Sequence, residues 1–228
     1  MEGQERLRAA SALVVGAGGL GCPAALYLAA SGIGRLTLAD GDKVDLTNLQ
    51  RQVLYHTHNV GSRKVDAARD ALLHLNPEVE IFTMPARLEG EALDKQVSKA
   101  SVVLDCSDNF ATRHAINRAC VKHGKPLVSA AAIRFEGQLM VFDLSQKTGP
   151  CYSCLFPEGG EIEEVQCSTM GVLAPLTGVL GAMQAMEAIK LVTGAGSVRE
   201  GLLIFDAKKT DWRAVRVKKD PACVVCAR

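Results

Sequence analysis

A glycine-rich hexapeptide near the amino terminus, GAGGLG, fits the pattern G-x-G-x-x-G with Gly16, Gly18 and Gly21 as its fixed glycines. It follows a short apolar run and opens an Ala- and Leu-rich run, the strand–turn–helix context that gives this motif its meaning. In that context the first glycine allows the tight turn, the second lets the backbone approach a phosphate, and the third lets helix and strand pack closely. Backbone N–H groups at the helix start then face the anion. We therefore assign Gly16, Gly18, Gly19 and Gly21 to nucleotide binding.

An acidic residue, Asp40, ends the second strand-like run of the chain. A carboxylate at that place can accept hydrogen bonds from ribose hydroxyls. The loop, its context and this acid coincide, which favours a bound nucleotide over a glycine-rich turn without a ligand. The motif by itself does not distinguish NAD from ATP.

A second group of charged and amide side chains has the character of a phosphate site. Asn48 and Arg51 follow the second strand-like run, and Lys64 stands near the start of a helical one. Asp108 comes at the carboxyl end of a later strand, the edge at which ligands bind in open α/β sheets. Arg51 and Lys64 could hold a triphosphate. Asp108 could bind Mg²⁺, which takes protein and phosphate oxygens together. On spacing alone, solvated surface charge is the alternative for these residues.

Two Cys-x-x-Cys pairs, Cys151 with Cys154 and Cys223 with Cys226, supply four thiolates. Each pair can fill two positions of a tetrahedral Zn²⁺, which would leave no open position for catalysis. The gap between the pairs exceeds that of a usual zinc ribbon, so a redox dithiol or unrelated thiols are the alternatives. A structural zinc here would tie the end of the chain to the loop after the sheet.

The other four of the eight cysteines divide into two kinds. Three lie in helix- or strand-like patterns and are expected to be small core residues: Cys22, Cys106 and Cys120. Cys167 lies in an aperiodic stretch, residues 149–170, and a loop of that length is usually functional or mobile. Its neighbours Glu163 and Glu164, if close, would raise the pKa of the Cys167 thiol and oppose its reactivity.

Strand-like and helical runs alternate up to about residue 133, which predicts a doubly wound, mainly parallel, Rossmann-like α/β sheet. The strand-like runs lie at 11–15, 35–40, 79–83, 101–106 and 126–130, and the helical runs at 22–31, 62–75, 91–98 and 111–123. Later strand-like runs at 136–142, 202–205 and 212–217 predict an antiparallel continuation on the same sheet. We expect a single domain over residues 1–228. Its nucleotide-binding part would span about 1–133, and the continuation with the zinc site about 134–228.

Composition narrows the classes of function. The chain has 26 Lys and Arg against 25 Asp and Glu, a net charge of +1, which excludes a broad basic surface for nucleic acid. The most apolar long segment, 172–192, is interrupted by Pro175 and Glu187, so it predicts a buried helix and no membrane span. The first residues are polar and unlike a signal peptide. We expect a cytoplasmic protein, in which eight cysteines indicate metal or redox chemistry rather than disulfides.

Several stretches together resemble the ThiF/MoeB/HesA family over nearly the whole chain. They are GAGGLG, ADGDKVDLTNLQRQ, GSRKV, DCSDNFATR and the two Cys-x-x-Cys pairs. Members of this family adenylate ubiquitin-like sulfur carriers and share ancestry with ubiquitin-activating enzymes. The stretches QLMVFD and FDAKKTDWR look more like the thiamine branch (ThiF) than the molybdopterin branch (MoeB), and HesA-like proteins are a third candidate.

The resemblance implies that the carrier's C-terminal Gly-Gly carboxylate attacks the α-phosphorus of MgATP and releases pyrophosphate. A carboxylate is ionised at neutral pH, so no general base is needed and catalysis is positioning and charge stabilisation. Carried over by position, Asp40 would bind the ribose, Asn48, Arg51 and Lys64 the phosphates, Asp108 the Mg²⁺, and the four paired cysteines a structural Zn²⁺. In the thiamine branch, a cysteine placed like Cys167 can join the carrier's thiocarboxylate through an acyl disulfide, and a cysteine desulfurase would be the sulfur donor.

The resemblance also implies a homodimer. Relatives usually begin with an additional segment whose arginine reaches the ATP of the partner subunit, and neither Arg6 nor Arg8 occupies that position. Either the natural protein has a preceding segment that this sequence lacks, or it adenylates without that arginine, in which case we expect weaker transition-state stabilisation. Three alternatives stay open beside a ThiS-like carrier: activation of a MoaD-type carrier for molybdopterin biosynthesis, an NAD(P)-dependent oxidoreductase, and a non-catalytic scaffold that binds a carrier.

Overall fold

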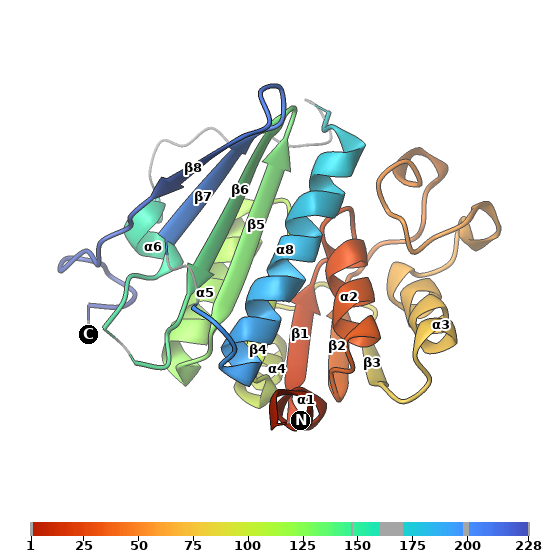
Figure 1. Cartoon of the computed structure of the whole chain (residues 1–228), viewed down its shortest axis with the longest axis horizontal. Coiled ribbons are helices and arrows are strands. Elements are labelled where there is room, and N and C mark those ends of the chain that lie inside the picture. Colours follow the sequence, from red (N-terminus) through yellow and green to blue (C-terminus); the bar gives the residue numbers. More distant parts are fainter. Residues whose placement is uncertain (1, 147, 160–170, 198–200, 228) are drawn as a thin grey trace.

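One eight-stranded sheet organises the chain (Figure 1). The computed structural model describes residues 2–146, 148–159, 171–197 and 201–227. Within them the strands follow the order β3-β2-β1-β4-β5-β6-β7-β8. The parallel part consists of β1 (Ser11–Val15), β2 (Arg35–Ala39), β3 (Glu80–Met84), β4 (Val102–Asp105) and β5 (Leu127–Ile133). The antiparallel continuation consists of β6 (Glu136–Phe142), β7 (Gly201–Asp206) and β8 (Asp211–Val215).

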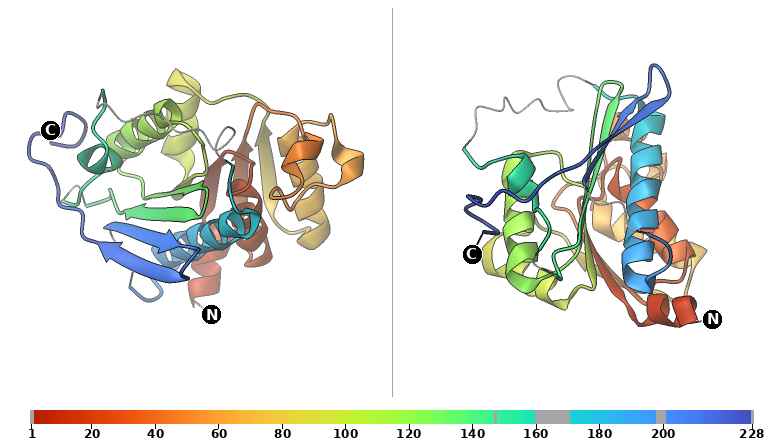
Figure 2. Two further views of the ribbon diagram at one scale, coloured as in Figure 1. Left: turned by 90° about the horizontal axis from the view of Figure 1, so that it is seen from above. Right: turned by 60° about the vertical axis from the view of Figure 1, so that its left-hand side comes forward.

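Helices cover both faces of this sheet, as the two turned views in Figure 2 show. The helices on one face are α2 (Gly21–Ala30), α3 (Lys64–Leu75) and α8 (Ala174–Thr193), and α1 (Glu2–Ala9) packs against α8. Those on the other face are α4 (Gly90–Lys99), α5 (Phe110–His123) and the short α6 (Tyr152–Leu155). Short 3₁₀ turns, η1 (Leu46–Asn48) and η2 (Thr57–Asn59), follow β2. The predicted fold class, a doubly wound parallel sheet with an antiparallel continuation, is confirmed.

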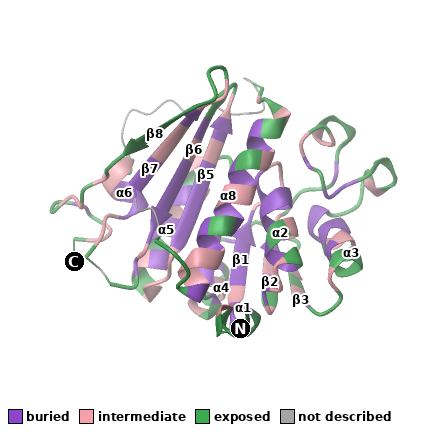
Figure 3. Ribbon diagram, viewed as in Figure 1, coloured by how far each residue is buried: buried purple, intermediate pink, exposed green. Residues whose placement is uncertain are grey.

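The core lies in two layers because the central strands are apolar on both faces. In β1, Ala12 and Val14 belong to the layer under α2 and α8, while Leu13 and Val15 belong to the layer under α4 and α5. Successive side chains of a strand point to opposite faces, so a strand buried on both must be a continuous apolar run. Figure 3 shows this burial across the middle of the sheet.

Helix α6 lies in the stretch that was expected to be an aperiodic loop, and two further features differ from the sequence-based prediction for a local reason. Helix α1 was not predicted, because its sequence EGQERLRA is polar and Leu7 is its one buried residue. The helical run expected from residue 62 begins at Lys64 instead. The chain before it is extended, with Arg63 paired to Lys43 in an isolated bridge and the Ser62 carbonyl accepting from the Val44 N–H. In the described part of the chain, none of the helices has the length and hydropathy that a membrane span requires.

Helices α2 and α8 approach each other at Gly181. A Cβ at this position would lie 2.3 Å from the Leu20 carbonyl oxygen and 2.5 Å from Pro23 Cγ. Gly181→Ala is therefore expected to lower the free energy of unfolding by roughly 1–3 kcal/mol, the usual cost of overpacking a core. Gly178→Ala is the matched control, since nothing lies within 4 Å of its Cβ position in the same helix. It should raise stability by up to about 1 kcal/mol through helix propensity. Urea unfolding measures both, and equal effects of the two variants would contradict the packing described.

Candidate functional site

A cavity of about 290 Å³ opens at the carboxyl ends of β1, β2 and β4. This is the point at which the strand order reverses, where ligands bind in open parallel sheets. Its wall includes all the predicted nucleotide-binding residues except Gly21: Gly16, Gly18, Gly19, Asp40, Asn48, Arg51, Lys64 and Asp108. Segments far apart in the sequence thus supply one concave, polar site.

The three fixed glycines of the loop after β1 have different structural roles. Gly16 has a φ of +98°, and a Cβ there would lie 2.6 Å from the Cys106 carbonyl oxygen, so only glycine fits. A Cβ on Gly21 would lie 1.9 Å from the Gly16 carbonyl oxygen, so this glycine serves the packing of α2 on β1 rather than the pocket wall. At Gly18 a Cβ would meet only Gln52 Nε2, at 3.7 Å, which leaves the backbone there open to the cavity.

Asp40 holds the glycine loop as well as facing the pocket. Its Oδ2 accepts a hydrogen bond from the Ala17 N–H at 2.7 Å, and its Oδ1 accepts one from the Asp42 N–H at 2.8 Å. A carboxylate has about four acceptor positions, so capacity for a ribose hydroxyl is left. The sequence indicated the ribose role and missed the contact with the loop.

Lys64 is a buried cation of the cavity wall, with a side chain only 7% exposed. Its Nζ lies 2.8 Å from Asp42 Oδ2 and 4.0 Å from Asp40 Oδ1. A buried ammonium group without a partner would cost considerable free energy. The two carboxylates offset that cost by pairing with Lys64. The ion pairs hold Lys64 beside the glycine loop, in reach of a ligand that binds there.

Asn48, Arg51 and Gln52 form a chain of amide contacts on the same side. Asn48 Oδ1 accepts from Gln52 Nε2 at 2.8 Å and from Arg51 Nη2 at 3.3 Å. Gln52 is only 3% exposed and lines the cavity, yet its Oε1 has no hydrogen-bond partner among the described residues. A buried acceptor left unpaired costs roughly 1–3 kcal/mol. This orphaned oxygen fits a site completed by a hydrogen-bond donor of a ligand.

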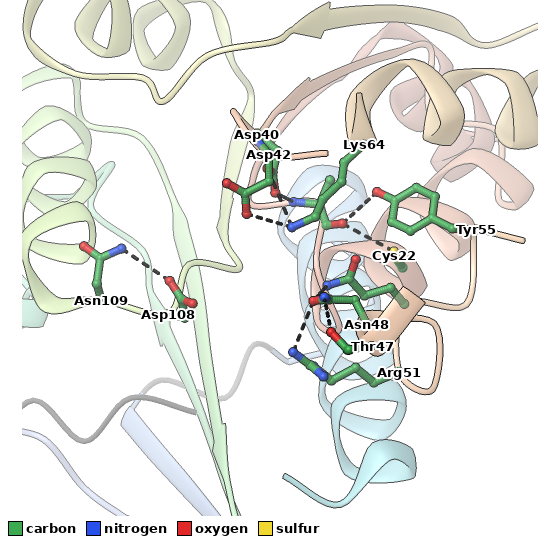
Figure 4. Close-up of polar contacts among 12 residues, drawn as sticks. Cys22, Asp40, Asp42, Thr47, Asn48, Arg51, Tyr55, Lys64, Asp108 and Asn109 are labelled. Carbon is green, nitrogen blue, oxygen red and sulfur yellow. Dashed lines mark hydrogen bonds and ion pairs between the residues drawn. The ribbon is translucent and has the colours of Figure 1, made fainter. Parts of the chain in front are cut away.

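Asp108 lies across the cavity from Arg51 and Lys64, as Figure 4 shows. Asn109 Nδ2 is 3.4 Å from its Oδ1, and the Asn109 side chain caps α5 by accepting from the Thr112 N–H. Arg51 and Lys64 therefore face a carboxylate with the cavity between them. Such a separation suits a ligand that carries negative charge toward one wall and a bound cation toward the other.

The loop that carries Asp108 rests on a buried polar network that the sequence did not predict. Asp105 is 1% exposed and accepts from the Ser107 hydroxyl at 2.6 Å and from the Ser129 hydroxyl at 2.7 Å. Arg113 lines the cavity and donates from Nη2 to the Ser107 carbonyl oxygen at 2.9 Å. The signal that could have found Arg113 is its place in DCSDNFATR, one turn into the helix that follows Asp108.

The two Cys-x-x-Cys pairs meet on the opposite side of β5–β8 from α8. The four sulfur atoms of Cys151, Cys154, Cys223 and Cys226 lie within 4.8 Å of one another, with separations of 3.7 Å and 3.4 Å across the pairs. A tetrahedral zinc with Zn–S bonds of about 2.3 Å requires sulfur separations of about 3.8 Å. The donor set and its spacing therefore fit Zn²⁺. The buried Asn117 orients this cluster by accepting from the Tyr152 N–H at 3.0 Å and donating toward Cys151 Sγ at 3.5 Å.

The cysteines expected in the core are buried: Cys22, Cys106 and Cys120. Burial raises the pKa of the Cys22 thiol to about 12 and that of Cys106 well above its usual range. Thiols that stay protonated are poor nucleophiles. Cys167, the candidate for sulfur transfer, lies outside the described residues.

Comparison with known proteins bears on what the cavity binds. A family model described as the ThiF family matches residues 1–225. The chain is 46% identical over 226 residues to the sulfur carrier protein ThiS adenylyltransferase of Escherichia coli K12, covering 99% of this chain and 89% of that protein. It is also 46% identical over 228 residues to the molybdopterin-synthase adenylyltransferase of Salmonella typhimurium, covering 100% of this chain and 91% of that protein.

Solved structures share the fold. A crystal structure of Escherichia coli MccB with ATP superposes with a TM-score of 0.87 at 23% identity, over 100% of this chain and 70% of that one. At that identity the likeness shows the fold alone.

Zinc content tests the cysteine cluster directly. We expect freshly purified, reduced protein to hold about one zinc ion per chain. Cys223→Ala should abolish this and lower the melting temperature, because a structural metal contributes its binding free energy to folding. Cys120→Ala is the matched control, a buried cysteine outside the cluster, and should keep the metal. Elemental analysis gives the zinc content, and reduced wild-type protein without zinc would contradict the assignment.

Proposed function

This chain belongs to the ThiF family, and we propose that it adenylates the C-terminal carboxylate of a ubiquitin-like sulfur carrier protein with MgATP. Two relatives at 46% identity are named adenylyltransferases, one of ThiS and one for molybdopterin synthase. The observation that carries the proposal is the cavity itself. It joins an open glycine loop, the cations Arg51 and Lys64 among others, and the opposed carboxylate of Asp108 at the reversal point of the sheet. This constellation favours a triphosphate over the NAD of the oxidoreductase alternative.

The chemistry is a displacement at the α-phosphorus. A carboxylate oxygen of the carrier forms a bond to the α-phosphorus. The bond between the α-phosphorus and the oxygen that bridges to the β-phosphorus breaks, and pyrophosphate leaves with that electron pair. The attacking carboxylate is already ionised near neutral pH, so the protein needs to supply no base. What it must supply is alignment of the two reactants and stabilisation of the charge that moves onto the leaving group.

The proposed roles follow the walls of the cavity. The N–H groups of Gly18 and Gly19 would face the phosphates, and Arg51 and Lys64 would offset their charge. The ion pairs of Lys64 with Asp40 and Asp42 place its ammonium group beside the glycine loop, where the phosphates would bind. Asp40 would accept from the ribose, and Asn48 would hold Arg51 and Gln52 in position.

Asp108 would hold the magnesium ion that accompanies ATP. Its carboxylate is exposed at the pocket wall opposite Arg51, and hard oxygen ligands are those Mg²⁺ takes. When bound, the metal would neutralise phosphate charge and orient the triphosphate. The protein's own part is to fix this carboxylate, through the buried Asp105, Ser107 and Arg113 contacts below it.

The four-cysteine cluster would hold Zn²⁺ as a structural ion. Its ligands come from α6 and from the end of the described chain, so the metal would tie these two segments together. With four thiolates the coordination shell is full, and zinc takes no part in the adenylation.

For the carrier we propose a ThiS-like protein of thiamine biosynthesis, with a MoaD-type carrier of molybdopterin biosynthesis as the second candidate. The thiamine-like stretches QLMVFD and FDAKKTDWR fall in β6 and in the β7–β8 hairpin, which pair side by side. Equal identity to adenylyltransferases of both kinds is the observation that keeps the second candidate. A homodimer, a cysteine desulfurase as sulfur donor and a cytoplasmic location complete the proposal.

Carrier-dependent ATP–pyrophosphate exchange tests this function. We expect exchange with a ThiS-type carrier that ends in Gly-Gly and none when that carrier is truncated. Lys64→Ala and Asp108→Ala should each lower kcat/KM by about 10²-fold or more, because each removes charge stabilisation at the phosphates. Lys43→Ala and Asp70→Ala, exposed charges outside the cavity wall, are the controls. No exchange with either carrier type would refute the proposal, and wild-type rates in a site variant would remove that residue from it.

After adenylation, we propose that a persulfide of the cysteine desulfurase attacks the acyl carbon of the carrier's adenylate and releases AMP. The Cys167 thiolate then attacks the sulfur bonded to the acyl carbon and displaces the desulfurase thiolate, which leaves an acyl disulfide between the carrier and Cys167. The assay for this step therefore contains the desulfurase and its cysteine substrate. We expect Cys167→Ala to keep ATP–pyrophosphate exchange at the wild-type rate and to lose a covalent, thiol-sensitive adduct with the carrier. Non-reducing electrophoresis and intact-protein mass spectrometry detect that adduct. An adduct of undiminished yield in the variant would show that Cys167 has no such role.

A further inference from the structure

We propose that Tyr55 is a positioning residue for phosphate binding, whose hydroxyl fixes the Ala17–Gly18 peptide so that the Gly18 N–H faces the nucleotide. Tyr55 lies outside the cavity wall and is only 4% exposed. The inference rests on the proposed use of ATP and adds to it a residue that would not touch the nucleotide.

The starting observation is that the side chains of Tyr55 and Cys22 point to one backbone carbonyl oxygen, that of Ala17 (Figure 4 labels the two side chains). The Tyr55 hydroxyl donates to the Ala17 carbonyl oxygen at 2.7 Å, and the Cys22 thiol lies 3.5 Å from the same oxygen. The Ala17 N–H in turn donates to Asp40 Oδ2 at 2.7 Å. Both backbone polar groups of this loop residue are therefore held by side chains from other segments.

Peptide geometry transmits this hold to the next residue. In a planar trans peptide the C=O of one residue and the N–H of the next point in opposite directions. The structure has no cis peptide bond among its described residues. When Tyr55 fixes the Ala17 carbonyl oxygen on one side, the Gly18 N–H must point to the other. Gly18 lines the cavity, so fixing one bond aims a phosphate donor.

Tyr55 also belongs to the turn that carries Arg51, one of the cationic side chains of the cavity wall. Its N–H donates to the Gln52 carbonyl oxygen at 3.1 Å, and the N–H groups of Gln52 and Arg51 both donate to the Asn48 carbonyl oxygen. One hydroxyl thus ties this compact turn to the glycine loop. The two halves of the phosphate site are joined before the nucleotide arrives, which reduces the ordering cost of binding.

The phenol suits this task better than the other donor to the same oxygen. Burial raises the pKa of Tyr55 far above its usual range, so its hydroxyl stays protonated at any pH in which the protein is studied. A thiol is a weak hydrogen-bond donor, so Cys22 cannot replace the phenol. Loss of the Tyr55 hydroxyl should therefore release the Ala17 carbonyl.

Tyr55→Phe is the test, because it removes one oxygen and keeps the packing of the ring. We expect its Kd and KM for ATP to rise about tenfold, the equivalent of one buried hydrogen bond, with kcat for exchange little changed. The affinity for adenosine, which has no phosphates, should stay at the wild-type value. Isothermal calorimetry measures the Kd for ATP, and competition of adenosine with ATP measures the Kd for adenosine. Tyr27→Phe, which changes a half-exposed tyrosine of α2, is the matched control and should alter neither affinity.

Each outcome separates the inference from the function on which it rests. If wild-type protein shows no affinity for ATP, the proposed function is wrong and the inference falls with it. If wild-type protein binds ATP and Tyr55→Phe binds it equally well, the inference alone is overturned. An equal loss of ATP and adenosine affinity would also overturn it, since that indicates a general distortion of the cavity. Should Tyr55→Phe be too unstable, the same comparison is made in a Gly178→Ala background.

Discussion

The whole site depends on a close approach of two backbone segments at the carboxyl ends of β1 and β4. Gly16 turns the chain at a φ of +98° directly against the Cys106 carbonyl oxygen, with no room for a side chain between them. Gly21 brings α2 equally close to the turn. Because these segments touch, the loop that offers backbone N–H groups and the loop that offers Asp108 open onto one cavity. A larger residue at Gly16 would separate the two walls that the proposed chemistry needs together, and a larger residue at Gly21 would push α2 away from the turn.

Helix α5 connects this cavity with the cysteine cluster. Arg113 and Asn117 are four residues apart and so lie on one face of the helix. Arg113 binds the Ser107 carbonyl in the loop before Asp108, while Asn117 binds the backbone and sulfur of the Cys151–Tyr152 segment. The cysteine cluster and the loop that carries Asp108 thus both attach to α5, although the cluster lies apart from the cavity. A metal held by the four cysteines would therefore be connected physically to the cavity without lining it.

Local patterns predicted most of the fold, and contacts between distant segments account for what they missed. Alternating apolar runs were enough to place the strands and the long helix α8, because buried strands and helices must be apolar over several residues. The motif residues could be proposed for nucleotide binding for a different reason: their side-chain types and spacing, together with the family resemblance, indicate that chemistry, and the structure brings all of them except Gly21 to one cavity. Tyr55 could not, since its partner Ala17 is 38 positions away in the sequence and no local pattern links the two residues. Gln52 and Arg113 lie within quoted motifs, but their burial could not be predicted, because a polar residue in a loop or on a helix gives no sign of burial until the fold encloses it.

The most direct test of the account is a crystal structure of this protein with magnesium and a non-hydrolysable ATP analogue. The account predicts that the triphosphate lies on the backbone of Gly18 and Gly19, with Arg51 and Lys64 within hydrogen-bond distance of its oxygens and the metal on Asp108. An analogue bound elsewhere, or bound here with those three side chains turned away from the phosphates, would contradict it.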